Sequence, residues 1–217
     1  IRSGYNATLF LDSAGDVWST GADTTSINLG SARTAPAKMA GIDNVVILQA
    51  HLESSYCAAF AIQTDGDMYA LGYNVVGSLG LGDSTNRSAW SQTGGSLTFS
   101  HVVLVGSSTG RSSVALSGVP GDLFDTTGKT VYVCGENGYG QLGQGNTTDS
   151  TSWIQPSTTS YGTSYLRTVT TADGSIDSSS NMTFPRTSVV DIYDASMNES
   201  AGLICYTDSQ ARFWYTG

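Results

Sequence analysis

The sequence predicts an all-β fold made of repeated units of about four short strands. Three observations predict it: an aromatic-rich run ending in glycine recurs along the chain, a second apolar run precedes each copy across a turn, and long amphipathic helical periodicity is missing. Glycine contributes 26 of the 217 residues, and Ser and Thr are frequent. This composition favours short strands and turns over helices.

Each repeated unit contains a predicted β-hairpin. Its second strand ends at Gly21, Gly72, Gly135 and Gly217, in SAGDVWSTG, TDGDMYALG, TTGKTVYVCG and TDSQARFWYTG. Its first strand is ATLFL (7–11), AAFAI (58–62), SSVAL (112–116) and AGLIC (201–205). Gly accepts positive φ and Asp or Ser can bond its own backbone, so the Asp-, Ser- and Gly-rich stretches between the runs are hairpin turns.

A glycine-rich turn follows the hairpin, and we interpret it as a structural element. YNVVGSLGLGD (73–83) matches ENGYGQLGQGN (136–146) position for position, and ADTTSINLGS (22–31) is a shorter, weaker copy. A phosphate-binding loop would need a lysine or a following helix, and a flexible linker would not recur in register. We therefore expect Leu79 and Leu142 to be buried. The glycines expected in conformations or contacts that a Cβ would disturb are Gly77, Gly80, Gly140 and Gly143.

The spacing of the units indicates a stacked array. The hairpin glycines are 51 residues apart (21 to 72), then 63 (72 to 135), then 82 (135 to 217), so insertions lengthen the loops. Units of this size bury their faces only against neighbours, as propeller blades or solenoid repeats do. We expect one domain over 1–217. Its repeats are predicted at about 5–50, 54–106, 110–156 and 200–217, with 157–199 as an inserted or irregular segment.

The combination of the hairpin, its glycine and N-x-x-G-Q-L-G-x-G-N resembles the repeats of the regulator of chromosome condensation family. The resemblance is closest over 131–146 and good over 60–83. It implies a β-propeller of four-stranded blades, usually seven in that family, of which three to four would lie in this chain. Family repeats commonly carry a histidine at the head of the first hairpin strand, and this chain departs from that pattern. The corresponding residues are Ala7, Ala58, Ser112 and Ala201, which indicates a divergent branch.

A half propeller would expose a blade edge at each end, so we expect further polypeptide, self-association or another protein to complete it. The resemblance implies that the two ends of a family chain build one blade together. We therefore interpret the 217 residues as a fragment. On this interpretation Phe213, Trp214 and Tyr215 would be buried in the complete particle.

Charge excludes some partners. Nine Lys and Arg stand against eighteen Asp and Glu, giving a net charge of −9 with only 12% charged residues. Such a surface cannot neutralise a phosphate backbone, so we expect no nucleic-acid binding, and guanine-nucleotide exchange is disfavoured. No apolar run is long enough to span a membrane, so we expect no membrane insertion.

Cysteines and histidines give no sign of a metal, cofactor or redox site. Cys57, Cys134 and Cys205 have no paired spacing and lie in or beside predicted strands, so we expect buried apolar thiols. His51 and His101 lie in comparable parts of successive units, so we interpret them as copies of one repeat position rather than as metal ligands.

Aromatic residues in the long loops are candidates for a binding surface. These are Trp90, Trp153, Tyr161 and Tyr165. Their amphipathic rings suit contact with a sugar or a protein partner. The competing interpretation is that they pack between blades.

No catalytic motif is present, such as G-x-S-x-G or a calcium loop, and Asp at hairpin turns is explained by turn chemistry. We expect a non-enzyme. The leading hypothesis is a structural and binding module on a virion surface or outside the cell, such as a phage tail or head fibre component contacting other virion proteins or a host-surface receptor. The alternative is a secreted or cytosolic propeller that binds one protein partner, and the third hypothesis is a polysaccharide-degrading enzyme.

Overall fold

The computed structural model describes residues 1–4, 6–21, 33–53, 56–106, 111–121 and 129–157, together with short strands between 167 and 216. All helical or strand secondary structure in these residues is β-strand, as the sequence predicts. In the same residues no helix is long and apolar enough to cross a membrane.

Three four-stranded antiparallel sheets follow one another along the chain, and we call them blades 1, 2 and 3. Blade 1 contains β1 (Arg2–Ser3), β2 (Ala7–Leu11), β3 (Val17–Gly21) and β4 (Arg33–Lys38). Blade 2 contains β5 (Val45–Leu52), β6 (Cys57–Gln63), β7 (Met68–Gly72) and β8 (Arg87–Thr93). Blade 3 contains β9 (Phe99–Gly106), β10 (Arg111–Ser117), β11 (Val131–Gly135) and β12 (Ser150–Ile154).

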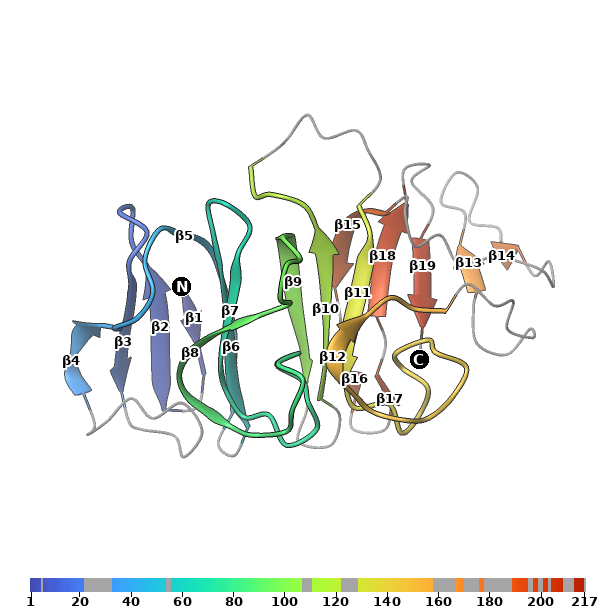
Figure 1. Cartoon of the computed structure of the whole chain (residues 1–217), viewed down its shortest axis with the longest axis horizontal. Helices are drawn as coiled ribbons and strands as arrows, with labels where there is room; N and C mark the ends of the chain where they lie inside the picture. The colour runs from blue at the N-terminus through green and yellow to red at the C-terminus, as the bar shows by residue number, and fades with distance from the viewer. Residues whose placement is uncertain are drawn as a thin grey trace.

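The blades are arranged as in a propeller. Within each blade the strands lie in sequence order, and the blades stand side by side in Figure 1. The first strand of blade 2, β5, contacts β1 of blade 1 and β9 of blade 3. First strands therefore line the inner side of the array, and fourth strands form its outer edge.

A fourth sheet lies next to blade 3 (Figure 1), with the order β14-β13-β19-β18-β15. Its strands are β13 (Arg167–Val169), β14 (Ile176–Asp177), β15 (Val189–Asp194), β18 (Ile204–Asp208) and β19 (Phe213–Thr216). A separate pair joins β16 (Met197–Asn198) to β17 (Ala201–Gly202). The segment 157–199 thus supplies β15 on the inner side of this sheet and the β13–β14 hairpin on its outer side.

The predicted hairpins are confirmed as β2–β3, β6–β7 and β10–β11, and their register explains two features of the repeat. The terminal glycine of each hairpin lies opposite a small residue, in the pairs Gly21↔Ala7, Gly72↔Ala58 and Gly135↔Ser112. Each of these glycines has φ between 105° and 111°. A Cβ at any of them would collide with the carbonyl oxygen of the residue before its small partner. The strand ends therefore require glycine.

A buried asparagine organises the glycine-rich turn of blade 2. Asn74 is fully buried, and its Nδ2 donates to the carbonyl oxygens of Asp83 at 2.9 Å and Thr85 at 3.2 Å. Its Oδ1 accepts from the backbone N–H of Leu79 at 2.9 Å, and its own N–H donates to Oδ1 of Asn86 at 2.7 Å. One side chain thus holds both ends and the middle of the turn.

The same network recurs in blade 3 around Asn137, which is also fully buried. Its Nδ2 donates to the carbonyl oxygens of Asn146 at 3.0 Å and Thr148 at 2.9 Å. Its Oδ1 accepts from Leu142 N–H at 2.9 Å, and its N–H donates to Asp149 Oδ1 at 2.7 Å. Leu79 and Leu142 are both 0% exposed, as the packing interpretation of these turns requires.

Blades 2 and 3 are joined by a tryptophan wedge. Trp153 on β12 packs 5.9 Å from Phe60 of blade 2 and 5.4 Å from Phe99, measured between ring centroids. Its indole N–H donates to Thr93 Oγ1 of blade 2 at 2.9 Å. The Thr93 hydroxyl in turn donates to the carbonyl oxygens of Leu79 and Gly80, at 2.7 and 2.8 Å. The outer strand of one blade is thereby bonded to the glycine turn of the blade before it.

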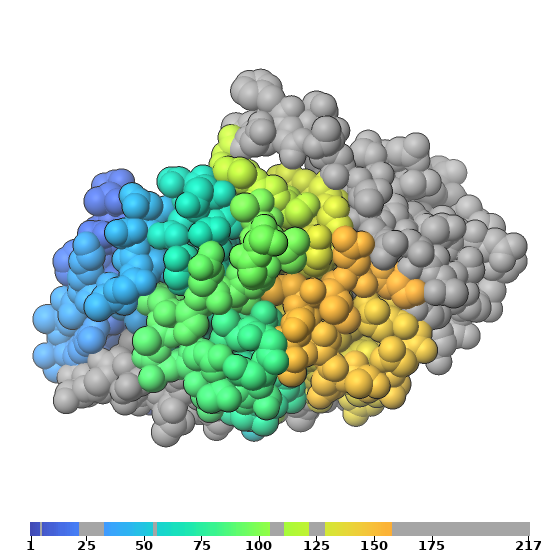
Figure 2. Space-filling model, viewed as in Figure 1, coloured from blue at the N-terminus to red at the C-terminus, as the bar shows by residue number. Residues whose placement is uncertain are grey.

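Close approach at this junction accounts for Gly77 and Gly80. A Cβ on Gly77 would meet the Thr151 backbone at 2.5 Å, and a Cβ on Gly80 would collide with the Trp153 indole. The backbones also bond directly, because Gly82 N–H donates to Thr151 O at 2.8 Å. In Figure 2 the green residues of blade 2 lie against the orange residues of blade 3.

The junction of blades 1 and 2 uses the same wedge with one hydrogen bond fewer. The strand register makes Trp90 on β8 the counterpart of Trp153, and Trp90 is 9% exposed in the core that the two blades share. Blade 1 carries Met39 where blade 2 carries Thr93, since Met39 N–H donates to Val17 O at the matching register. Accordingly, the Trp90 indole N–H has no hydrogen-bond partner among the described residues.

Replacing Gly143 with valine should lower the free energy of unfolding by about 2–4 kcal/mol, because Gly143 has φ of 62° and a β-branched side chain is strained there. Urea denaturation followed by circular dichroism measures the change. Gly138→Val is the matched control, since a Cβ there meets nothing within 4 Å and the φ of Gly138 is not in the left-handed region. Equal effects of the two substitutions would contradict the turn interpretation.

Replacing Thr93 with valine keeps the shape but removes the hydroxyl between Trp153 and the glycine turn. The free energy of unfolding should fall by about 1–3 kcal/mol, because a buried indole N–H loses its acceptor. Thr85→Val is the control, since Thr85 is exposed and its hydroxyl makes no hydrogen bond within the described residues. A Thr93→Val variant as stable as this control would show that the wedge holds by packing alone.

Candidate functional site

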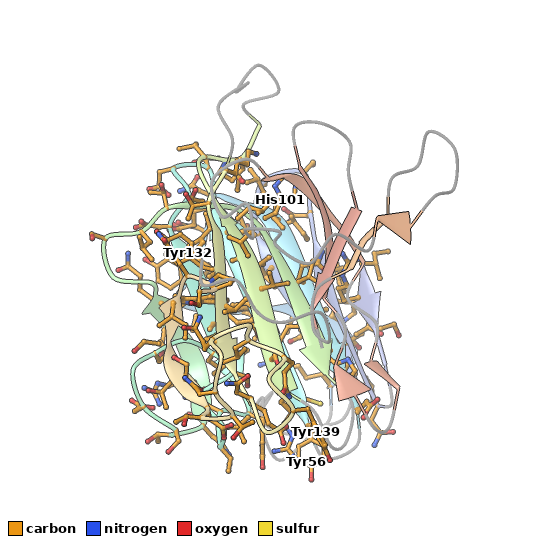
Figure 3. All side chains as sticks on the ribbon, turned by 90° about the vertical axis from the view of Figure 1, so that its right-hand side faces the viewer. Tyr56, His101, Tyr132 and Tyr139 are labelled. Atoms are coloured by element: carbon orange, nitrogen blue, oxygen red, sulfur yellow. The ribbon has the colours of Figure 1, made fainter. Side chains whose placement is uncertain are left out.

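The glycine turns lie at one end of the strands, and we call this end the turn face (residues 73–86 and 136–149). Figure 3 labels Tyr56 and Tyr139 at this end of the molecule, with His101 and Tyr132 toward the other end. The hairpin turns of blades 1 and 2 lie opposite to it (Figure 1). The turn face therefore collects the starts of β6 and β10 and the ends of β7 and β11.

An arginine stacked on two tyrosines lies at the turn face. The Arg111 guanidinium carbon is 3.9 Å from the ring centroid of Tyr56 and 4.8 Å from that of Tyr73. The two rings meet edge to face, with centroids 4.9 Å apart and planes at 88°. Such cation–π contacts contribute about 0.5–2 kcal/mol, depending on their desolvation. We call these three residues the tyrosine–arginine stack.

Hydrogen bonds fix the stack across two blades. Arg111 begins β10 of blade 3, and its Nη1 donates to Tyr73 Oη of blade 2 at 3.1 Å. Its backbone N–H donates to Glu136 Oε2 at 3.1 Å, and Glu136 N–H donates back to Arg111 O at 2.8 Å. The guanidinium thus lies against both tyrosine rings, and hydrogen bonds from its side chain and backbone join Arg111 to Tyr73 and Glu136.

The repeat does not require the tyrosine–arginine stack. Strand register makes Asn6 and Cys57 the counterparts of Arg111 in blades 1 and 2. The counterpart of Tyr73 in blade 3 is Glu136. Residues needed for the blade itself recur at matching positions, as the hairpin glycines do in all three blades and as Asn74 and Asn137 do in blades 2 and 3. Among the described residues the stack occurs in one place, so it has some other role, either stapling two blades or binding a ligand.

Two exposed apolar side chains extend the turn face. Val75 is 51% exposed and Tyr139 is 63% exposed, although both lie within two residues of a fully buried asparagine. The backbone N–H of Tyr139 donates to Gln141 Oε1 at 2.9 Å, which fixes the start of this tip. Tyrosine and arginine are the residue types enriched where proteins bind each other most strongly.

The described residues show no arrangement for acid–base or nucleophilic catalysis. His101 Nδ1 lies 3.2 Å from Ser100 Oγ, but the Ser100 hydroxyl donates to Ser117 O at 3.1 Å, so its proton is not available to the imidazole. His51 Nε2 lies 3.3 Å from the Glu53 carboxylate. In the same part of the chain, no group of three or more His, Cys, Asp or Glu could hold a metal ion.

The structure places two of the four aromatic candidates in the interior. Trp90 and Trp153 are 9% and 8% exposed, so they form the blade wedges described above and do not present a binding surface. For these two residues the structure supports the competing interpretation, that they pack between blades. Tyr161 and Tyr165 lie outside the described residues. Tyr56, Tyr73 and Arg111 were missed, since Tyr56 and Arg111 meet only through the fold.

The histidines are not repeat copies, which corrects a further expectation. His51 pairs with Ala58 on β6, whereas His101 pairs with Leu116 on β10. Because Ala58 corresponds to Ser112, the counterpart of His51 is Val105, four residues beyond His101. Cys57 and Cys134 are buried thiols as expected, and burial raises the pKa of Cys134 well above its usual value. The side chain of Cys205 lies outside the described residues.

Known structures share this blade arrangement. The structure of human WBSCR16 superposes on 99% of the chain and 45% of its own length, with a TM-score of 0.63 and 14% identity. Yeast RCC1 (Prp20) in its complex with Kap60 covers 98% of the chain and 42% of its own, with a TM-score of 0.57 and 13% identity. The chain has the fold of the regulator of chromosome condensation propellers. Its expected all-β, partial-propeller architecture is thereby confirmed.

The sequence supports the same repeat type. Over 136 residues the chain is 33% identical to the Protein RCC2 homolog of Danio rerio, a match that covers 62% of this chain. The matched part spans about a quarter (24%) of that relative. No protein-family model matches the chain. A further structure, Prp20p of Saccharomyces cerevisiae, which is described with its binding to Gsp1p and histones, has a TM-score of 0.52 and 18% identity, over 72% of this chain and 37% of its own.

Acid should weaken the turn face through Asp83. The Arg87 guanidinium, 2.6 Å from Asp83 Oδ2, and the Thr85 N–H, 2.8 Å from Oδ1, lower the pKa of this carboxyl below 3.8. Its stabilising contribution is present above about pH 3.8 and is lost as pH falls through the lower folded-state pKa.

Asp83→Asn should therefore lower the melting temperature at pH 7 and flatten its decline between about pH 4 and pH 2. Arg87→Gln should flatten it too, because it removes the largest cause of the shift. Calorimetric scans across this range make the measurement. An unchanged decline in both variants would show that Asp83 is not coupled to folding.

Proposed function

We propose that this chain is part of a propeller that binds another protein through the turn face. The observation that carries the proposal is the tyrosine–arginine stack, which spans blades 2 and 3 and whose arginine position is Asn6 in blade 1 and Cys57 in blade 2. Its three side chains are partly exposed and already ordered by ring contacts and by the hydrogen bond between Arg111 and Tyr73. A preordered aromatic and guanidinium surface loses little side-chain entropy when a partner binds.

The surroundings of the stack suit a protein ligand. Val75 and Tyr139 project apolar surface from the tips of two successive turns, while Asp83 and Arg87 form an ion pair at the side. An apolar and aromatic centre with charged groups around it is the usual composition of a protein interface. The net charge of −9 disfavours a nucleic-acid ligand and favours a partner with a basic surface.

The comparisons support the same class of function. The relatives in complexes bind proteins: Prp20p is described with Gsp1p and histones, and yeast RCC1 with Kap60. The proposal takes from them the class, a protein-binding propeller, and not the partners. It corresponds to the second of the hypotheses drawn from the sequence.

Placement on a virion is a narrower form of the proposal. It rests on composition alone, namely 12% charged residues and abundant Ser, Thr and Gly. Host receptors or other virion proteins would then be the partners of the turn face. Mass spectrometry of purified virions tests this placement independently, because absence of the chain would remove it and leave the protein-binding proposal intact.

A photo-crosslinking amino acid at position 139 tests the proposed face. It should capture a partner in extracts of the source cell, whereas the same amino acid at exposed Ala14, in the β2–β3 hairpin at the other end of the strands, should not. Arg111→Ala should reduce capture from position 139 about tenfold or more, since hot-spot truncations cost about 2 kcal/mol or more. Arg111→Lys should fail to restore it, because an ammonium cannot stack as a planar guanidinium does.

Two experimental results would contradict the proposal. One is equal capture from positions 139 and 14, which would mean that the turn face is not special. The other is full capture by Arg111→Ala in a protein that melts at the native temperature. Melting curves of each variant separate loss of binding from loss of fold.

A further inference from the structure

The two faces of blade 1 differ in burial. Ala7, Leu9 and Val17 face blade 2 and are 0–3% exposed. The opposite side carries Thr8, Phe10, Trp18 and Thr20, all of them partly exposed, and we call it the outer face of blade 1. Blade 1 stands at the left end of the row of blades in Figure 1, with blade 2 on its other side.

The outer face of blade 1 is a flat aromatic and hydroxyl surface. Phe10 lies directly opposite Trp18 in the strand register, with ring centroids 6.4 Å apart and planes only 4° from parallel. The Trp18 indole N–H donates to Asp12 Oδ2 at 2.8 Å, so its polar group is satisfied. Thr8 lies opposite Thr20 beside this pair.

In blades 2 and 3 the same positions are the seats on which the preceding blade packs. The counterparts of Phe10 are Ala61 and Ala115, both 0% exposed. Ala61 shares a core with Leu9 of blade 1, and Ala115 shares a core with Phe60 of blade 2. Each seat thus carries a small side chain where the blade packed on it presents a large one.

In blade 1 the large and small side chains are exchanged between these positions. Phe10 replaces the alanine in the second strand, and exposed Pro36 occupies the register position of the wedge tryptophans Trp90 and Trp153 in the fourth. A leucine or phenylalanine presented by an ordinary incoming blade would need the space that Phe10 already fills. Overpacked cores are destabilised, so such a blade would not fit.

We propose that the outer face of blade 1 binds one further propeller blade that is small opposite Phe10 and bulky opposite Pro36. The occupant is a blade because this face continues the series of two interfaces already formed in the structure. The reversed sizes make the junction selective, since a blade with the size pattern of blades 1 or 2 is excluded by steric overlap. The inference is independent of the proposed binding function.

The chain's own blade 2 provides the probe. We would fuse a second copy of residues 42–93 ahead of Ile1 through a flexible linker, once unchanged and once with Phe60→Ala in the copy only. Hydroxyl-radical footprinting of Trp18 reports whether the outer face is covered. Trp153, buried in the unmodified chain and absent from the copied segment, is the internal reference.

The Phe60→Ala copy should reduce oxidation of Trp18 several-fold, and the unchanged copy should not. With Phe10→Ala in the receiving blade the unchanged copy should protect Trp18, which also establishes that this copy folds. Equal protection of the native Phe10 face by both copies would overturn the size reversal. Protection in none of the combinations would overturn blade docking at this face.

Discussion

In blades 2 and 3 the structure depends on the burial of one side-chain amide in each glycine turn. Asn74 and Asn137 are each 0% exposed, and a buried amide without partners is costly. Both Nδ2 hydrogens have carbonyl acceptors, and Oδ1 accepts from the N–H of the buried leucine. These bonds exist only when the turn has one conformation, so satisfying the amide fixes the turn and places Leu79 or Leu142 in the core. The turn can then serve as a rigid surface for the next blade.

Blade stacking follows from that rigid turn. Trp153 can wedge against blade 2 because Gly77 and Gly80 leave room and because Thr93 joins the indole to the carbonyls of the turn. The wedge consists of a large ring with one polar atom, and the polar atom is used at one junction and unused at the other. Trp90 shows that ring burial alone keeps the wedge in place, while the added bond at Trp153 makes that junction more specific.

The repeat could be predicted from sequence because the local rules agree with one another. Alternating strands, turn residues and the aligned glycines each predict hairpins, and the structure has them at the expected residues. The asparagine could also have been found, since it holds the second position in both YNVVGSLGLGD and ENGYGQLGQGN. The direction in which the Trp90 and Trp153 side chains point could not be predicted from the sequence, because it depends on which face of an outer strand meets the previous blade. Arg111 and Tyr56 are 55 positions apart, and only the fold brings them together.

Repetition itself separates structural from functional residues in this molecule. A residue that the blade needs recurs at the same register, as the hairpin glycines and the small residues opposite them do in three blades and as the turn asparagines do in blades 2 and 3. Residues that break the pattern carry information of another kind, because the neighbouring blades fold without them.

Two places in the described residues break it with several side chains at once: the tyrosine–arginine stack at the turn face and the Phe10–Trp18 pair on the outer face of blade 1. The stack is braced by hydrogen bonds within the chain and partly exposed at its rim, which suits a surface that receives a separate molecule. The pair has the position of a blade seat and the wrong size for an ordinary blade, which suits a surface that receives one particular blade.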